Sequence, residues 1–465
     1  MPYVTYVTYI NRKRKIVKAS ILGISILSLA ACTALYAQEV VGVPSSFEPR
    51  LYSGGQAIVP TSSIAHPEDA GQRMHTNFML FIPNKPPAGS AVEPMATRNT
   101  SNTPATGYYY ETPQTLACLY GLVAWTAGCN PYTMSNSSPH AVGGSRGIAI
   151  IDAYDYPTAL NDLTKYSAQF GLPAPTASTF TQVYASGTKP ATDPACASGN
   201  GWNCWSAEEA LDIEMAHAMA PSAHIYLVEA ASNSFADLDV AVKKAVSLLT
   251  TSPNTGGEVS MSYGGGEFSG ETSEDSAYIG KNVVFFASTG DHEGVEYPSA
   301  SPNVVAVGGT TLSRSPYNLA IESEISWEDG GGGYSQYEPV PSYQTALFGA
   351  SAARAVPDVA AIGNPRTGVW VYDSYQTANL IGVPNWLIFG GTSVASPLTA
   401  GIVNHAGHFS ASTSAEETVL YANGLFSPNL RDITYGSCGY YEGWFAAEGW
   451  DPCTGLGAPY GILGK

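Results

Sequence analysis

Charged side chains are scarce in this chain, and positively charged ones most of all. Only 12% of the 465 residues are charged, and 20 Lys and Arg stand against 38 Asp and Glu, a formal net charge of −18. Binding of nucleic acid needs clustered positive charge, so this balance argues against that class of partner. Gly and Pro are plentiful, at 48 and 32 residues. They follow no repeat period, which argues against a collagen-like or disordered chain.

The sequence also lacks an apolar run that would cross a membrane, which needs about 20 residues. A shorter run at residues 21–31 follows five basic residues within residues 12–18. This arrangement predicts a signal peptide over residues 1–37 and a secreted protein without a membrane span. Cleavage after Ala37 competes with cleavage before Cys32, where residues 29–32 resemble a bacterial lipoprotein box and would leave a lipid anchor on the periplasmic or outer side.

Zinc-type cysteine spacing is absent too, since no CxxC pattern or nearby His pair occurs. Without Cys32, six cysteines remain, an even number that suits an oxidising compartment. The simplest pairing closes three short loops, namely Cys118 with Cys129, Cys196 with Cys204, and Cys438 with Cys453.

The organisation of the chain changes near residue 107. Residues 38–107 are rich in Pro, Ser, Thr and Ala without a sustained period, which predicts a short propeptide or a loosely ordered extension. Beyond them, continuous apolar runs alternate with amphipathic stretches, which predicts an α/β domain over residues 108–465 with a mostly parallel sheet and helices on both faces. The expected strands are 147–151, 223–229, 258–263, 282–288 and 303–307, and the expected helices are 159–170, 206–219 and 235–249.

A serine stands close to the start of a further helix-like stretch. Residues 390–397 read GGTSVASP and precede the apolar residues 398–406. The glycines would expose the Ser393 hydroxyl, and backbone N–H groups at a helix start can face developing negative charge. The simpler alternative is that Thr392 or Ser393 only caps the helix.

No histidine has the HGT-like context of a subtilisin base, and His217 is more simply a packed or helix-end side chain. Carboxylates could take the place of a histidine as the base. Ser206 and Glu209 have the spacing of a capping box, which would place Glu208 and Asp212 at i and i+4 on one helix face. The apolar neighbours favour burial of this pair over a solvated face.

A third acid, Asp291, follows the expected strand at 282–288, where a turn aspartate is the simpler alternative. With the other motifs, it occurs in an order that resembles one family. From about Tyr108 onward, the chain resembles the sedolisin (serine-carboxyl peptidase) family, especially its kumamolisin-like branch. The motifs that carry the resemblance are ExxxD at 208–212, SMSYG at 260–264, GD at 290–291, GGGYS at 331–335, GTSxxxP at 391–397, DI at 432–433 and WDPCTG at 450–455.

The resemblance implies a role for each matching residue. Ser393 would be the nucleophile, Glu208 the general base and then acid, and Asp212 the group that orients Glu208. Asp291 would line the oxyanion hole. Asp152, at a position where Glu is frequent, would extend the network behind the base. The substrate would lie along Ser262, Tyr263 and Gly264.

The same resemblance implies one structural Ca²⁺ bound near the C-terminus. Its ligands would be the Asp432 and Asp451 carboxylates with main-chain carbonyls of Ile433, Ala447 and Gly449, which matches the preference of calcium for oxygen ligands. Two turn aspartates in a glycine-rich tail are the simpler alternative.

The implied activity is hydrolysis of proteins or peptides by a monomeric endopeptidase with an optimum at about pH 3 to 5. A histidine base is protonated below about pH 6.5, whereas a carboxylate still accepts a proton at about pH 4. Self-cleavage of the extension is expected near residues 106–109. Two alternatives stay open: a secreted, non-catalytic binding protein on a peptidase fold, and a histidine-dependent subtilisin-like protease.

Overall fold

The computed structural model describes residues 50–461 apart from 53, 85–101, 106, 199–200, 252–254, 376–377, 425–426 and 440–442. The predicted signal peptide with its alternative cleavage positions, at Ala37 and before Cys32, lies outside the described residues. No helix within the described ranges has the length and apolar character needed to cross a membrane.

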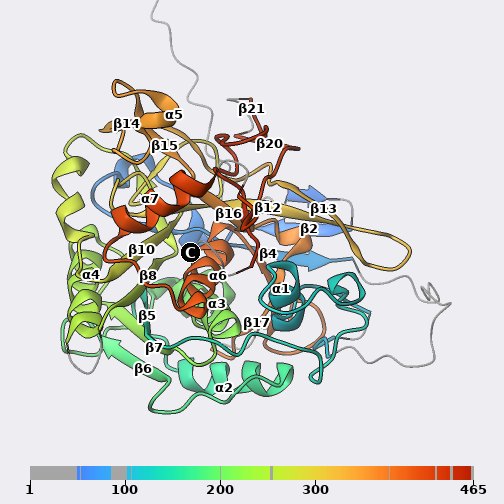
Figure 1. The fold of residues 1–465 in the computed structure, drawn as a ribbon. Helices are drawn as coiled ribbons and strands as arrows, with labels where there is room; N and C mark the ends of the chain where they lie inside the picture. The colour runs from blue at the N-terminus through green and yellow to red at the C-terminus, as the bar shows by residue number, and fades with distance from the viewer. Residues whose placement is uncertain are drawn as a thin grey trace, which may run out of the picture. The chain divides into compact units, whose positions relative to one another are not determined.

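The central sheet has eight strands in the order β13-β12-β10-β8-β5-β7-β6, with β16 also paired to β12 (Figure 1). Every pairing is parallel except that of β13 with β12. The mostly parallel α/β architecture predicted from the sequence is therefore confirmed. The strands are β5 (Gly147–Ala153), β6 (Phe180–Tyr184), β7 (His224–Ala230), β8 (Gly257–Met261), β10 (Val283–Ser288), β12 (Val305–Arg314), β13 (Ile321–Ser326) and β16 (Val359–Ile362).

The remaining strands form smaller sheets. They are β1 (Arg50–Tyr52), β2 (Gly55–Ile58), β3 (His75–Thr76), β4 (Met79–Pro83), β9 (Tyr263–Gly266), β11 (Glu296–Tyr297), β14 (Gly333–Pro339), β15 (Ala353–Val356), β17 (Val369–Tyr372), β18 (Trp386–Gly390), β19 (Leu430–Arg431), β20 (Ser437–Cys438), β21 (Trp444–Phe445) and β22 (Ala458–Pro459). The described α-helices are α1 (Pro113–Leu119), α2 (Ala159–Phe170), α3 (Trp205–Met219), α4 (Phe235–Thr250), α5 (Thr345–Phe348), α6 (Thr392–Ala406) and α7 (Thr413–Gly424).

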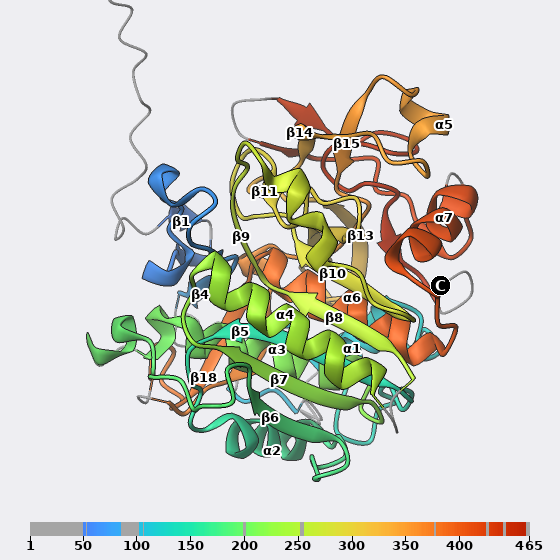
Figure 2. The same cartoon turned by 90° about the vertical axis from the view of Figure 1, so that its left-hand side faces the viewer.

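Helices cover both faces of the central sheet. Along β5, Ile148 and Ile150 enter an apolar core shared with α2, α3 and α6, whereas Ala149 and Ile151 enter a second core shared with α4. Figure 2 shows α4 on the near side of the sheet and α3 and α6 behind it. A strand buried on both faces needs apolar residues at successive positions, which explains the continuous apolar runs in the sequence.

The starts of two helices differ from the prediction. Helix α3 follows Cys204, which makes no side-chain cap, so the capping box expected at Ser206 is wrong. The Asp193 carboxylate accepts the Trp205 N–H at 3.1 Å and satisfies that end of the helix instead. Helix α6 begins at Thr392, well before residue 398, and its N-cap is Gly391. Neither Thr392 nor Ser393 is therefore the N-cap residue.

The extension before residue 107 contains strands, so the expectation of a loosely ordered extension is wrong for its described part, while its role as a propeptide stays a prediction. β1, β2 and β4 continue an antiparallel sheet in the order β1-β2-β4-β18-β17. The apolar residues 78–81 are buried within it. These strands pair with β18, which lies some 300 residues later in the sequence and directly precedes α6. A periodicity confined to the extension could not reveal such a partner.

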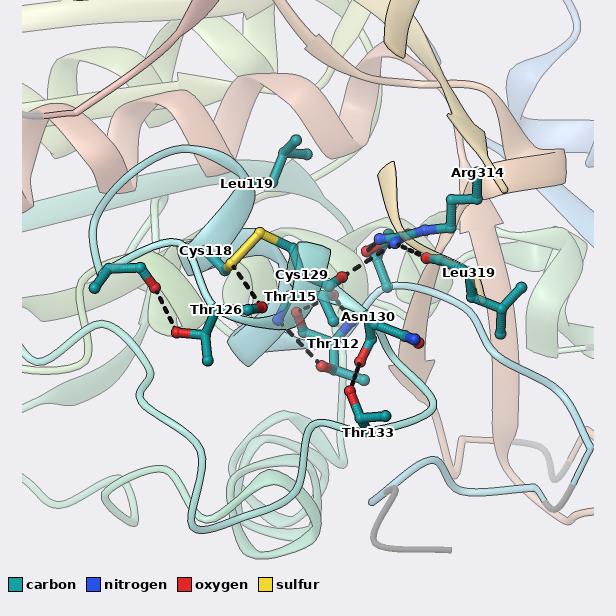
Figure 3. Close-up of a disulfide and its surroundings, with 12 residues drawn as sticks. Thr112, Thr115, Cys118, Leu119, Thr126, Cys129, Asn130, Thr133, Arg314 and Leu319 are labelled. Atoms are coloured by element: carbon teal, nitrogen blue, oxygen red, sulfur yellow. Dashed lines mark hydrogen bonds and ion pairs between the residues drawn. A yellow bond between two sulfur atoms is a disulfide. The ribbon is translucent and has the colours of Figure 1, made fainter. Parts of the chain in front are cut away.

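All three predicted disulfides are present, Cys118–Cys129, Cys196–Cys204 and Cys438–Cys453. Figure 3 shows the first of them beside Arg314. The Arg314 guanidinium donates to the carbonyls of Cys129 and Leu319 and forms an ion pair with Glu111 at 2.6 Å. The disulfide loop is thereby connected to the end of β12.

Candidate active site

Ser393 lies in the first turn of α6. Gly391 precedes it with φ of +109°, in the left-handed region that a glycine adopts without strain. The Ser393 side chain is fully buried, and its Oγ donates to Glu208 Oε2 at 2.9 Å. Pro397 has no N–H to continue the helix ladder, and the Ser393 carbonyl accepts a hydrogen bond from Ser262 Oγ at 3.3 Å.

Glu208 and Asp212 come from α3, which packs against α6, and both side chains are fully buried. Burial raises the pKa of Glu208 well above its usual range, and the nearby carboxyl groups of Asp212 and Asp152 raise it further. The hydrogen bond from Ser393 acts in the opposite direction, because it favours the ionised form. Asp152, on β5, also has a strongly raised pKa through burial and through Asp212. Three carboxyl groups from two elements thus share one buried region, as the sequence predicted for the pair on α3.

Asp291 follows β10 and meets the start of α6. Its Oδ1 accepts the Thr392 N–H at 2.7 Å and the Thr392 hydroxyl at 2.9 Å. Its Oδ2 is buried without a hydrogen-bond partner in the described structure. Burial raises the pKa of Asp291 well above its usual range. A protonated Oδ2 could therefore donate a hydrogen bond to a neighbouring oxygen.

A segment of the N-terminal extension lies against Ser393, which the sequence analysis did not anticipate. β3 pairs antiparallel with β9, so that His75 lies opposite Gly264. The next residue but one, Asn77, donates its N–H to the Ser262 carbonyl at 3.3 Å. The stretch predicted to bind substrate, Ser262 to Gly264, is thus paired with the chain's own residues 75–77. The one signal in the sequence was the apolar run at residues 78–82.

The main chain of Asn77 lies directly against Ser393. The Ser393 N–H donates to the Asn77 carbonyl oxygen at 2.9 Å, and the Asn77 N–H lies 3.1 Å from Ser393 Oγ. A Cβ added to Gly391 would lie 2.2 Å from the Asn77 carbonyl oxygen and 2.6 Å from Asp291 Oδ2. The carbonyl and the Asp291 carboxyl therefore face the same small space. Beyond Asn77, β4 pairs antiparallel with β18 and carries the segment out of the site.

Comparisons with known proteins agree with this arrangement. A profile described as the Subtilase family matches residues 176–419. Kumamolisin from Bacillus sp. (strain MN-32) is 34% identical over 367 residues, which cover 69% of this chain and 59% of kumamolisin. Sedolisin from Pseudomonas sp. (strain 101) is 33% identical over 177 residues, which cover 35% of this chain and 28% of sedolisin.

The chain belongs to the sedolisin family, within the subtilase group. Its fold is also similar to that of a solved Pseudomonas sedolisin, a serine-carboxyl proteinase complexed with two molecules of pseudo-iodotyrostatin. The TM-score is 0.56 at 21% identity, and the match covers 75% of this chain and 95% of that chain. This sedolisin-family chain spans 59% of the length of kumamolisin.

The C-terminal acids expected to bind calcium lie on two sides of one turn. Asp432 Oδ2 accepts the Gly449 N–H at 3.0 Å, and its Oδ1 is buried without a hydrogen-bond partner in the described structure. Asp451 accepts hydrogen bonds from the N–H groups of Ala447, Cys453 and Thr454 and from the Thr454 hydroxyl. The unpartnered Asp432 oxygen, next to the peptide of Ile433, fits an oxygen-ligated cation.

The histidine-dependent alternative receives no support from the contacts of Ser393. Its Oγ meets the Glu208 carboxyl, the Ser262 carbonyl and the Asn77 N–H. His217 lies on α3, with Nε2 at 2.9 Å from the Pro173 carbonyl oxygen. Burial lowers the pKa of His217 to about 4.

Proposed function

We propose that this chain is an acid-acting serine-carboxyl peptidase that hydrolyses peptide bonds through an acyl-enzyme on Ser393. The observation that carries the proposal is the 2.9 Å hydrogen bond from Ser393 Oγ to Glu208 Oε2, within a fully buried set of carboxyl groups. Membership of the sedolisin family supports it. Secretion, a monomeric state and endopeptidase cleavage of proteins or peptides belong to the same proposal.

In the first half of the reaction, Ser393 Oγ adds to the substrate carbonyl carbon while its proton passes to Glu208. Glu208 accepts that proton when it is ionised, and Asp212, whose carboxyl group interacts with that of Glu208, orients it. Because the carboxyl groups interact, they titrate as a set with shared apparent pKa values. Because the pKa of Glu208 is raised, the group holds a proton over much of the acid range, and the reaction proceeds through the ionised fraction of this set of carboxyl groups. A histidine base, by contrast, is charged at about pH 4.

The oxyanion that forms is stabilised by two donors. The Ser393 N–H points at the position of a bound carbonyl oxygen, and a protonated Asp291 offers a second hydrogen bond from Oδ2. An ionised Asp291 would repel the oxyanion, so activity requires its proton. Glu208 then returns its proton to the leaving amine. Water attacks the acyl-enzyme ester with Glu208 as base, which releases the acid product and restores Ser393 Oγ–H.

A structural calcium ion forms the last part of the proposal. Asp432 and Asp451, with the carbonyls of Ile433, Ala447 and Gly449, would hold it. The ion would crosslink the turn that joins β21 to the C-terminal Cys453 segment. It takes no part in the peptide chemistry.

The experiment is a digestion of a peptide library by the full chain from about pH 2 to pH 8. We expect a maximum between about pH 3 and 5, and Ser393→Ala should lower the rate by at least about 10³-fold. Ser414→Ala, on the exposed face of α7, is the matched control and should leave the rate unchanged. A maximum at neutral pH would contradict the carboxylate mechanism. Acid activity that survives Ser393→Ala would point to a contaminant and to the non-catalytic alternative.

A further inference from the structure

The side chain of Asn77 occupies a closed polar pocket beside the nucleophile. Its Nδ2 donates to Ser288 Oγ at 2.9 Å and to Glu296 Oε2 at 3.0 Å. Asn77, Ser288 and Glu296 are each about 1% exposed or less. Both N–H bonds of the amide are therefore used, and the pocket offers oxygen acceptors to whatever side chain enters it.

The pocket is built to bring the Glu296 carboxylate close. A Cβ at Gly264 would lie 2.0 Å from Glu296 Oε2, and one at Gly290 would lie 2.8 Å from the carboxyl carbon. Any side chain at these two positions would displace the carboxylate. Glycine at positions 264 and 290 therefore leaves room for the Glu296 side chain to line the pocket between β9 and the end of β10.

Charge in the pocket is already balanced. His292 Nε2 lies 2.6 Å from Glu296 Oε1, and His75 Nε2 lies 3.4 Å from the same oxygen. The Glu296 carboxylate raises the pKa of His292 to about 9, and the histidines keep the pKa of Glu296 below its usual value. An entering lysine or arginine would add a second positive charge beside His292, and an aspartate would meet a carboxylate. A neutral amide satisfies the acceptors without either cost.

The main chain presents one peptide bond to Ser393. The Asn77 carbonyl accepts the Ser393 N–H, the residues before it pair with β9, and those after it pair with β18. Both sides of the Asn77–Phe78 bond are thus held in extended pairing, as a peptide substrate must be held for attack at its middle.

We propose that Ser288 and Glu296 select a carboxamide side chain, that of asparagine, on the acyl side of the bond that is cut, and that Asn77–Phe78 is the chain's own first substrate. This proposal rests on the proposed peptidase function. In the step, Ser393 Oγ bonds to the Asn77 carbonyl carbon, the C–N bond to Phe78 breaks, and the Phe78 amine receives the proton through Glu208. Water then releases the Asn77 carboxylic acid. The cleavage expected near residues 106–109 stays a separate prediction, and Thr106 itself lies outside the described residues.

The test exposes the purified full chain to acid and maps its termini by mass spectrometry. We expect a new N-terminus at Phe78, absent in Ser393→Ala. Asn77→Leu should slow this cleavage at least 10-fold. Asn84→Leu, an exposed position in the same extension, should not. A wild-type chain that digests added peptides but remains joined at 77–78 would overturn the proposal.

The pocket is tested separately on a peptide library with every residue on the acyl side of the cut bond. The wild-type protein should prefer Asn, and Glu296→Gln should reduce the preference for Asn over Leu at least 10-fold. Glu322→Gln, exposed on β13, is the matched control. Activity without preference for Asn would overturn the inference and leave the peptidase function intact. Absence of Ser393-dependent cleavage of any peptide would instead contradict the proposed function itself.

Discussion

Glu208 and Glu296 are two buried carboxyl groups near Ser393 whose surroundings have opposite charge. Glu208 faces Asp212 and Asp152, and burial among acids raises its pKa. Glu296 faces His292 and His75, and these histidines outweigh burial so that its pKa falls. Desolvation favours the neutral acid in both places, so the neighbouring charges decide which group stays ionised. One region can therefore hold and pass protons, while the other keeps an ionised acceptor for the Asn77 side chain.

The largest effect should come from a substitution in the region where Glu208 faces other acids, Asp212 and Asp152. Glu208→Gln removes the proton acceptor and should lower kcat by about 10²- to 10⁴-fold, because that is the usual contribution of a positioned general base. The measurement is kcat at pH 4 on a peptide identified by library digestion, with circular dichroism to verify the fold.

The adjacent residue provides the matched control for that change. Glu209 is equally buried and its pKa is also raised by burial, but its carboxyl group interacts with Glu229 instead of Ser393. Glu209→Gln should therefore retain kcat within a few-fold. Equal losses in the two variants would mean that the buried acids act on stability and not on the chemistry.

A smaller effect, on thermal stability, is expected at Asp432 and Asp451, whose carboxylates would bind a metal ion. If Ca²⁺ binds at Asp432 and Asp451, a calcium concentration of about 100 times Kd should stabilise the fold by about 2.7 kcal/mol. The measurement is Tm with calcium and after chelation. Asp432→Asn should lose most of the response, and Asp239→Asn, which breaks only a surface ion pair with Lys243, should keep it. An unchanged Tm on chelation would exclude the calcium site.

The smallest effect, counted for each pH unit, is on the free energy of unfolding, and it comes from a buried carboxyl group outside the candidate site. Burial raises the pKa of Glu258 to about 8, although Asn404 donates to it at 2.6 Å. The folded state thus keeps this proton to a higher pH than the unfolded chain. Its contribution to stability is complete below about pH 4.3 and is lost as pH rises towards 8, by up to about 1.4 kcal/mol per pH unit.

Urea unfolding between pH 4 and pH 8 measures that slope. Because Gln does not titrate, Glu258→Gln should reduce the slope of the unfolding free energy against pH by the amount that corresponds to about one proton. Glu322→Gln, at an exposed position, should leave that slope unchanged. A wild-type slope of the opposite sign would show that ionised carboxylates paired with cations, such as Glu296, dominate the pH dependence.

Much of the fold was predictable because its signals are local in the sequence. Helix α2 has the predicted bounds 159–170, and α4 differs by one residue. The three disulfides close loops of 11, 8 and 15 residues, so proximity along the chain was sufficient to pair them. The i and i+4 spacing of Glu208 and Asp212 likewise needed only the helix that carries them.

What could not be predicted depends on contacts between distant segments. Asn77 and Ser393 are separated by 316 positions, yet the Ser393 N–H donates to the Asn77 carbonyl and the Asn77 N–H donates to Ser393 Oγ. The start of α3 was misassigned because Asp193, across a disulfide loop, satisfies its first N–H group. His292 stands four positions before Glu296, but nothing in the sequence indicates that His75, in the extension, lies against the same carboxylate.

The sequence by itself determined the alternation of strands and helices, the disulfide pairs and the residue types that could carry acid catalysis. Helical and extended periods and short loops act over a few residues, so these features can be read locally. Only the tertiary structure decided which carboxyl groups keep their protons and which part of the chain lies on Ser393. Both depend on burial and on neighbours from separate elements, because the energy of a charge is set by everything around it in space.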